Sequence, residues 1–235
     1  MNPGDDDSDV EEGPGSPACY LHELGPDGQP GFDRVQAKDV ARWRKAERER
    51  LIAVRMSLAQ DDRAARTLAI IRELERLIPA GPDRIVSVYW PIRGEPDLRE
   101  WMRSRCERGG RVALPVAIAL GQPLEFREWR PHEPMVRGLW KIPYPANGAV
   151  VIPTVVLAPV VGFDGDCYRL GYGGGFFDRT LARLSPKPLT IGLGYSEAAI
   201  PTIFPQPHDI PMDWVVTGTE ASRRREPCSG AGKQR

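Results

Sequence analysis

The stretch YRLGYGGGFFDR, from Tyr168 to Arg179, carries the residues best suited to chemistry in this sequence. Four of them are glycines, which lack a Cβ and adopt positive φ angles, so that consecutive backbone N–H groups can converge on an anion. A helix that begins directly after such a loop adds free N–H groups and the positive end of its dipole. The stretch therefore indicates either a phosphate-binding loop or a glycine-rich turn between a strand and a helix.

Two charged side chains in this stretch fit the first interpretation. Arg169 can form a bidentate contact with a phosphate, and Asp178 can bind Mg²⁺ or cap the following helix. The common phosphate-loop patterns do not match: G-x-x-x-x-G-K-[ST] is absent, and Phe176 stands where G-x-G-x-x-G requires its last glycine. The order of strand, arginine, glycine loop and helix favours phosphate binding.

A basic segment lies near the N-terminus. Arg44 and Arg48 are one helical turn apart in the expected helix 39–57, so the pair can reach one phosphate group. The alternative is a solvated helix face, in which Glu47 and Glu49 partner the arginines.

Two further loops contain polar side chains beside aromatic or proline residues. In WPIRGEPD, Glu95 can accept hydrogen bonds from a heterocycle and Trp90 can stack on it; a surface carboxylate and a core tryptophan are the alternatives. In QPHDIPMD, Asp209 can bind Mg²⁺, with Asp213 as an alternative ligand, or the segment is a simple turn.

The elements that must position these residues alternate between strands and helices. Apolar, β-branched runs predict strands in the segments 84–90, 111–117, 153–163, 189–195 and 212–218. Helical spacing and capping patterns predict helices that begin at Asp39, at a capping box from Ser57 to Gln60, near Asp97, and at Phe176. This alternation predicts a three-layer α/β fold with a mostly parallel sheet and helices on both faces. Ligands bind such sheets beyond the carboxyl ends of the strands.

Composition limits the class of protein. The chain has 235 residues, 41% of them hydrophobic, and zero formal net charge, so we expect no nucleic-acid partner. No apolar run approaches the ~18 residues of a membrane-spanning helix. Four distant cysteines (19, 106, 167 and 228) indicate reduced thiols in a cytoplasmic protein and no structural zinc site. We expect one domain over residues 38–220, between an acidic, disordered N-terminal tail (1–37) and a flexible, basic C-terminal tail (221–235).

Four stretches of the sequence, taken together and in their order along the chain, resemble the 5-formyltetrahydrofolate cyclo-ligase family, which is also called 5,10-methenyltetrahydrofolate synthetase. GFDGDCYRLGYGGGFFDR (162–179) is similar to the family signature G-F-D-x-x-G-x-R-L-G-x-G-x-G-Y-Y-D; YWPIRGEPD (89–97), IPYP (142–145) and HDIPMDWVVT (208–217) match more weakly. The basic segment 47–58 resembles the family's N-terminal helix, and the whole resemblance spans residues 39–220. Phenylalanines replace the usual tyrosine pair, Cys167 replaces a glycine, and Gly174 stands where some members carry lysine.

The resemblance implies ATP-dependent closure of 5-formyltetrahydrofolate, with or without a polyglutamate tail, to 5,10-methenyltetrahydrofolate. ATP would phosphorylate the formyl oxygen, N10 would attack the activated carbon, and ADP and phosphate would be released. Such a reaction needs positioning and charge neutralisation more than a protein nucleophile.

The resemblance also implies roles for individual residues. Arg169 and Asp178 would be catalytic, Asp178 and Asp209 would bind Mg²⁺, and Trp90, Glu95 and Tyr172 would bind the substrate. The ATP contacts would come from the helix and the loop: Arg44, Lys45, Arg48, Arg169, Leu170, Gly171, Tyr172, Gly173, Gly174, Gly175, Phe176 and Phe177. The register between Arg44 and Lys45 stays open.

Other classes of protein compete with the enzyme. A non-catalytic module that binds a nucleotide, folate or RNA on the same scaffold is the main alternative, and a dinucleotide-dependent enzyme is disfavoured by the failed glycine pattern. The expected oligomeric state is a monomer or a weak homodimer.

Overall fold

The computed structural model describes residues 34–79, 81, 83–219 and 221–223. The described residues fall into two units, 34–41 and those from 42 onward, and the sheet and the candidate site belong to the second unit. The predicted tails lie largely outside the described residues, as do Cys19 and Cys228. Helix α1 (Arg34–Ser57) nevertheless begins four residues inside the predicted N-terminal tail, and strand β11 lies at the start of the predicted C-terminal tail.

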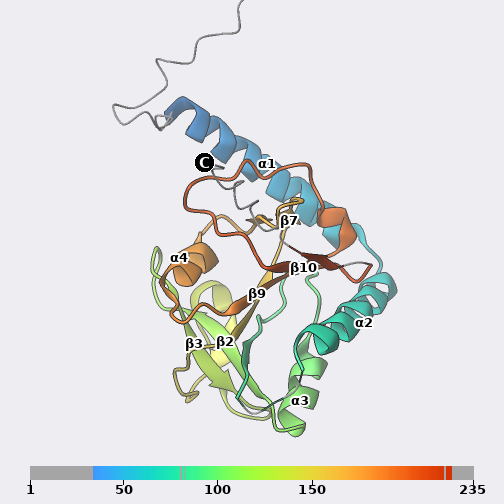
Figure 1. Cartoon of the computed structure of the whole chain (residues 1–235), viewed down its shortest axis with the longest axis vertical. Coiled ribbons are helices and arrows are strands. Elements are labelled where there is room, and N and C mark those ends of the chain that lie inside the picture. The colour runs from blue at the N-terminus through green and yellow to red at the C-terminus, as the bar shows by residue number, and fades with distance from the viewer. Residues whose placement is uncertain (1–33, 80, 82, 220, 224–235) are drawn as a thin grey trace, which may run out of the picture. The chain divides into compact units, whose positions relative to one another are not determined.

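The second unit is built on a seven-stranded sheet in the order β11-β10-β9-β6-β1-β2-β3 (Figure 1). The five inner strands pair in parallel, and β3 and β11 add antiparallel edges. Buried β-branched residues dominate the inner strands, as expected for a sheet that is covered on both faces. The bounds are β1 (Ile85–Ser87), β2 (Arg111–Ala117), β3 (Leu124–Trp129), β6 (Val155–Pro159), β9 (Leu189–Leu193), β10 (Trp214–Val216) and β11 (Ala221–Arg223).

Helices cover both faces of this sheet (Figure 1). On one face, α2 (Gln60–Leu77) and α3 (Arg99–Glu107) pack Leu74 and Met102 into a core with alternate strand residues such as Leu157. On the other face, α4 (Phe176–Arg183) buries Leu181 against the intervening strand residues, among them Ala158. This alternation follows from the two-residue period of a strand. The predicted three-layer α/β class is confirmed.

Two small hairpins bring loops to the carboxyl ends of the inner strands. Strands β7 (Gly162–Phe163) and β8 (Arg169–Leu170) pair antiparallel, so the glycine loop leaves β8 directly and enters α4. Strands β4 (Met135–Arg137) and β5 (Pro143–Pro145) flank the short 3₁₀ helix η2 (Leu139–Lys141). A second 3₁₀ helix, η3 (Ser196–Ala198), follows β9.

Each of the five predicted strand segments contains a strand of the main sheet, but most bounds differ, and the edge strand β3 was not predicted. The strand expected at 111–117 is β2 to the residue, whereas only three residues of 84–90 form β1. The capping box from Ser57 was wrong: Ser57 ends α1 and donates its hydroxyl to the Val54 carbonyl, and α2 begins at Gln60 without a side-chain cap. Asp39 lies inside α1 and does not start it. Among the described residues, no helix is long and apolar enough to cross a membrane.

The turn that follows β10 requires glycine at position 218 both for its backbone conformation and for lack of space. Gly218 has a φ of +86°, and a Cβ placed there would lie 2.6 Å from the Arg66 carbonyl oxygen. Gly109 has a similar φ of +79° but open space around it. We expect Gly109→Ala to lower the free energy of unfolding by about 1 kcal/mol and Gly218→Ala by roughly 2 kcal/mol more, because only the second adds a backbone collision. Equal losses in denaturant titrations of the two variants would contradict this.

Candidate active site

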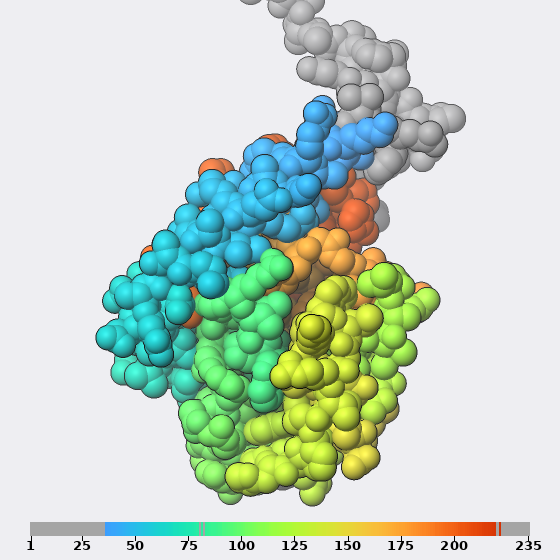
Figure 2. All heavy atoms as spheres, turned by 180° about the vertical axis from the view of Figure 1, so that it is seen from behind, coloured from blue at the N-terminus to red at the C-terminus, as the bar shows by residue number. Residues whose placement is uncertain are grey.

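A cavity of about 600 Å³ lies beyond the carboxyl ends of β1, β2 and β6. This volume is typical of small-molecule sites. Figure 2 shows it as a hollow between the green segment that follows β1 and the yellow segment around η2. Its lining combines the loop after β1, the end of β2, the β4–β5 hairpin, the glycine loop and residues 208–209. The cavity therefore collects the stretches that the sequence singled out separately.

The glycine loop forms one wall of the cavity with its backbone. Gly173 has a φ of +93° and Gly175 a φ of +61°, conformations that L side chains rarely adopt. Within the described part of the chain, the N–H groups of residues 173–178 donate to no protein acceptor. Unpaired donors of this kind at a loop and a helix N-terminus are the usual binding groups for a phosphate.

Arg169 and Asp178 form an ion pair at the base of the loop. The Arg169 guanidinium donates to Asp178 Oδ2 at 3.0 Å and lies 5.0 Å from the centre of the Phe177 ring. Asp178 Oδ1 accepts the N–H of Ile210, the residue that follows Asp209, at 3.3 Å. Burial lowers the pKa of Arg169, and the carboxylates of Asp178 and Asp209 oppose that effect. Arg169 is thus a desolvated cation on the cavity wall.

The two predicted arginines on α1, Arg44 and Arg48, have different hydrogen-bond partners. Arg44 is buried, and its guanidinium donates to the carbonyl oxygens of Ile203 and Phe204 and to both oxygens of Asp209, the closest at 2.5 Å. Arg48 donates its Nε to the Gly171 carbonyl oxygen at 2.7 Å and lines the cavity. Most donors of Arg44 are therefore committed to the protein, and Arg48 has more donors left for a ligand.

Asp209 is held by its neighbours. Besides Arg44, the Gln206 N–H donates to its carboxylate at 2.6 Å. Burial would raise the pKa of Asp209, but these hydrogen bonds outweigh burial and lower it. Asp209 is therefore a carboxylate fixed in its ionised form at the cavity wall.

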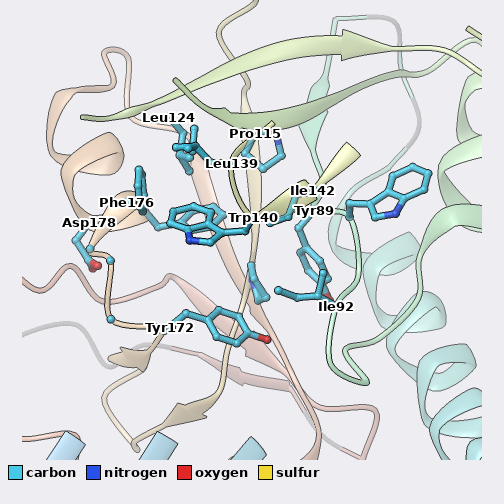
Figure 3. Close-up of a pocket in the computed structure, with 18 of the residues that line it drawn as sticks. Tyr89, Ile92, Pro115, Leu124, Leu139, Trp140, Ile142, Tyr172, Phe176 and Asp178 are labelled. Atoms are coloured by element: carbon cyan, nitrogen blue, oxygen red, sulfur yellow. The ribbon is translucent and has the colours of Figure 1, made fainter. Parts of the chain in front are cut away.

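Glu95 also lines the cavity and is hydrogen-bonded to the backbone and to Tyr172 of the glycine loop. It is 5% exposed, its Oε2 accepts the Ile92 N–H at 2.8 Å, and its Oε1 accepts the Tyr172 hydroxyl at 2.6 Å. The Tyr172 oxygen in turn accepts a hydrogen bond from Arg55. Burial raises the pKa of Glu95 above its ordinary value, although these hydrogen bonds and the nearby arginines oppose the shift. Figure 3 shows the Tyr172 hydroxyl directed toward Ile92.

Sequence reasoning missed two residues of this site. Arg55 lies in the basic segment 47–58, where sequence reasoning assigned it no role, but it is buried and also donates to the carbonyl oxygens of Arg93 and Val160. Trp140 lies on the cavity wall with its side chain 60% exposed and a φ of +56°. Figure 3 shows the indole beside Phe176, and the two rings meet edge to face at 5.3 Å. The only signal in the sequence for Trp140 was its position two residues before IPYP, because its exposure appears only in the fold.

The cavity brings together nearly all the predicted site residues. Trp90 lines it and also packs against the core, and stacking of this side chain on a ligand stays a prediction. Lys45 is exposed and lies outside the lining, as does Asp213, whose carboxylate accepts the N–H and hydroxyl of Thr190. The predicted residues that line the cavity are Arg44, Arg48, Trp90, Glu95, Asp209 and the whole loop from Arg169 to Asp178.

Known proteins resemble the chain over this same region. The sequence model of the 5-formyltetrahydrofolate cyclo-ligase family matches residues 40–218. The 5-formyltetrahydrofolate cyclo-ligase of Mycolicibacterium smegmatis is 32% identical over 142 residues, which are 57% of this chain and 73% of that protein. The Escherichia coli K12 enzyme of the same name is 32% identical over 140 residues, 56% of this chain and 76% of its own.

Solved structures agree with the sequence relatives. The 5,10-methenyltetrahydrofolate synthetase of Aquifex aeolicus superposes with a TM-score of 0.68 at 26% identity, over 81% of this chain and 97% of its own. The Mycoplasma pneumoniae synthetase gives a TM-score of 0.62 at 22% identity, over 74% and 98%, which supports the fold. With the match over residues 40–218 and the cavity that gathers the signature residues, this chain belongs to the 5-formyltetrahydrofolate cyclo-ligase family.

Proposed function

We propose that this protein catalyses the ATP-dependent cyclisation of 5-formyltetrahydrofolate to 5,10-methenyltetrahydrofolate, with release of ADP and phosphate. In this reaction the formyl oxygen takes the γ-phosphoryl group and later leaves as part of phosphate, while N10 forms the new C–N bond. The supporting observation is that the unpaired loop N–H groups, Arg169 and the buried carboxylate of Glu95 line the same cavity. The substrates in this proposal, ATP and 5-formyltetrahydrofolate, are those of the family to which the chain belongs.

At the glycine loop, the protein would neutralise negative charge. The N–H groups of residues 173–178, Arg48 and Arg169 would contact the nucleotide phosphates, and Arg44 would hold Asp209 in place. Arg169 would act on the transferring group because its guanidinium is desolvated and cannot deprotonate at neutral pH. Since fixed donors need no rearrangement as charge develops, they lower the barrier without a protein nucleophile.

Around Glu95, the protein would hold the pterin. The Glu95 carboxylate can accept hydrogen bonds from the N–H groups of the ring, while Trp90, Tyr172 and Trp140 supply aromatic surface. The neighbouring arginines 55 and 93 help Glu95 to stay ionised. Fixing the folate in this way would bring its formyl group toward the loop, where the phosphates would lie.

The residues present fit a Mg²⁺ ion that arrives with the nucleotide. Within the described ranges, no group of three or more His, Cys, Asp and Glu side chains could hold a metal by itself. Mg²⁺ bound to nucleotides, however, needs only one or two carboxylates beside phosphate oxygens and water. Asp178 and Asp209 line the same cavity, and Asp178 contacts the backbone of Ile210. These two carboxylates would hold the ion, which supplies charge neutralisation at the phosphates.

The sequence-based expectations of a cytoplasmic location, a monomer or weak homodimer, tolerance of a polyglutamate tail and no nucleic-acid partner stay predictions. The non-catalytic module also stays an alternative, and one assay separates it from the enzyme. Purified protein with Mg-ATP and 5-formyltetrahydrofolate is expected to produce the absorbance of methenyltetrahydrofolate, with one ADP per product. Binding of both ligands in calorimetry without product would favour the module.

A further inference from the structure

Arg179 contacts the backbone of the glycine loop but is not part of the cavity lining. It lies on α4, and its guanidinium donates to the Gly174 carbonyl oxygen. Gly173, Gly174 and Gly175 line the cavity, whereas Arg179 does not. The proposed roles of Arg169 and Arg48 leave Arg179 without an assigned function.

The geometry of the peptide bond links this contact to the cavity. In a trans peptide, the carbonyl of one residue and the N–H of the next point in opposite directions. A guanidinium that holds the Gly174 carbonyl therefore fixes the Gly175 N–H in the direction away from Arg179. That N–H donates to no protein acceptor among the described residues, and Gly175 lines the cavity.

The guanidinium itself is held tightly in place. Its Nη1 lies 2.9 Å from the position that a Cβ on Gly175 would occupy, and its Nε is buried without a hydrogen-bond partner. The Phe176 ring lies 5.4 Å from the guanidinium carbon, so the cation also contacts an aromatic ring. Arg179 is thus packed between the loop backbone and that ring.

Phe176 completes this packed unit. A Cβ on Gly174 would lie 2.7 Å from the Phe176 ring, so the glycine leaves room for the aromatic side chain. The Phe176 ring also contacts Trp140, on the β4–β5 hairpin. Glycines at 174 and 175, the phenylalanine at 176 and Arg179 therefore depend on one another sterically.

We infer that Arg179 is a positioning residue for nucleotide binding, which acts through the loop backbone and aims the Gly175 N–H at a phosphate. The identity of the ligand rests on the proposed function, but the geometry of the loop does not. Phe176 serves this role with its ring and needs no hydroxyl, which accounts for the phenylalanine at that position.

The test compares Arg179→Ala with Arg183→Ala, which removes an equal charge from an exposed position one turn later on α4. Titration with a non-hydrolysable Mg-ATP analogue is expected to give about tenfold weaker binding for Arg179→Ala and unchanged binding for Arg183→Ala. In turnover, the KM for ATP is expected to rise by a similar factor, while the KM for 5-formyltetrahydrofolate stays within about twofold.

A third variant separates positioning from charge. Arg179→Gln keeps a donor for the Gly174 carbonyl without a positive charge, and we expect it to retain most of the nucleotide affinity. Affinity as low as that of the alanine variant, or an Arg183→Ala variant that is equally impaired, would overturn the inference. Direct titration needs no turnover, so weaker analogue binding by Arg179→Ala in a protein that forms no product would contradict the proposed function alone.

Discussion

Replacing Arg169 with methionine is expected to lower kcat/KM for ATP by about 10²- to 10³-fold, the usual cost of removing one fixed donor from a developing negative charge. Methionine keeps much of the buried volume but removes the guanidinium that contacts Asp178 and lines the cavity. Steady-state kinetics with each substrate varied in turn measure the loss, and thermal unfolding measures the stability of the same variant.

The ion pair provides the control for this variant. Removing only Arg169 leaves Asp178 without its charged partner, which costs stability in a partly buried pair. The double variant Arg169→Met with Asp178→Asn removes both charges and is expected to recover stability without recovering turnover. If turnover returned together with stability in the double variant, Arg169 would be a structural residue of the loop.

Replacing Glu95 with glutamine is expected to raise the KM for 5-formyltetrahydrofolate by about 10- to 100-fold, because hydrogen bonds to a charged acceptor are the stronger ones. The amide fits the same space and can still interact with Tyr172. Tyr172→Phe is the matched control: it keeps the carboxylate and removes only the hydroxyl, so its effect on KM is expected to be smaller. A larger effect for Tyr172→Phe would place the main substrate contact on the tyrosine.

Because the pKa of Glu95 is raised, the stability of Glu95→Gln relative to wild type is expected to depend on pH. Folded Glu95 keeps its proton to a higher pH than in the unfolded chain, so between the ordinary and the raised pKa the folded state binds more protons. Stability therefore falls as pH rises through that window. Glutamine does not titrate, so Glu95→Gln is expected to unfold at an equal or higher temperature than wild type at neutral pH. The advantage is expected to disappear below the ordinary carboxyl pKa.

The same titration is expected to appear in catalysis. A carboxylate that binds the pterin must be ionised, so kcat/KM for 5-formyltetrahydrofolate is expected to fall on the acidic side at a pH above the ordinary carboxyl value. The acidic fall is expected to be absent in Glu95→Gln. An unchanged pH profile would assign the titration to another group.

The five inner strands of the sheet were predicted because they are buried on both faces and read as continuous apolar runs, whereas the edge strands β3 and β11 were not predicted. The β2 strand was predicted to the residue. The first residues of helices were harder to predict, because a capping box forms only if its first residue lies outside the helix as the N-cap. The Ser57 hydroxyl instead bonds back to Val54 within α1. Short edge strands such as β11 carry too few residues for a pattern to emerge.

The site was predictable where chemistry is local and missed where it depends on packing. The glycine loop, Arg169 and Asp178 lie within ten residues, so their order was visible. Arg55 was missed because its partners, Arg93, Val160 and Tyr172, are distant in sequence and meet only in the fold. The shared cavity likewise forms only in the fold, where the loop after β1 and the loop after β8 line the same space.

The most direct test of the proposed reaction follows the formyl oxygen. Protein is incubated with Mg-ATP and 5-formyltetrahydrofolate that carries ¹⁸O in the formyl group, and the released phosphate is analysed by mass spectrometry. Phosphorylation of the formyl oxygen predicts one ¹⁸O atom in phosphate for each methenyltetrahydrofolate formed. Product formation with the label in water, and unlabelled phosphate, would contradict the account.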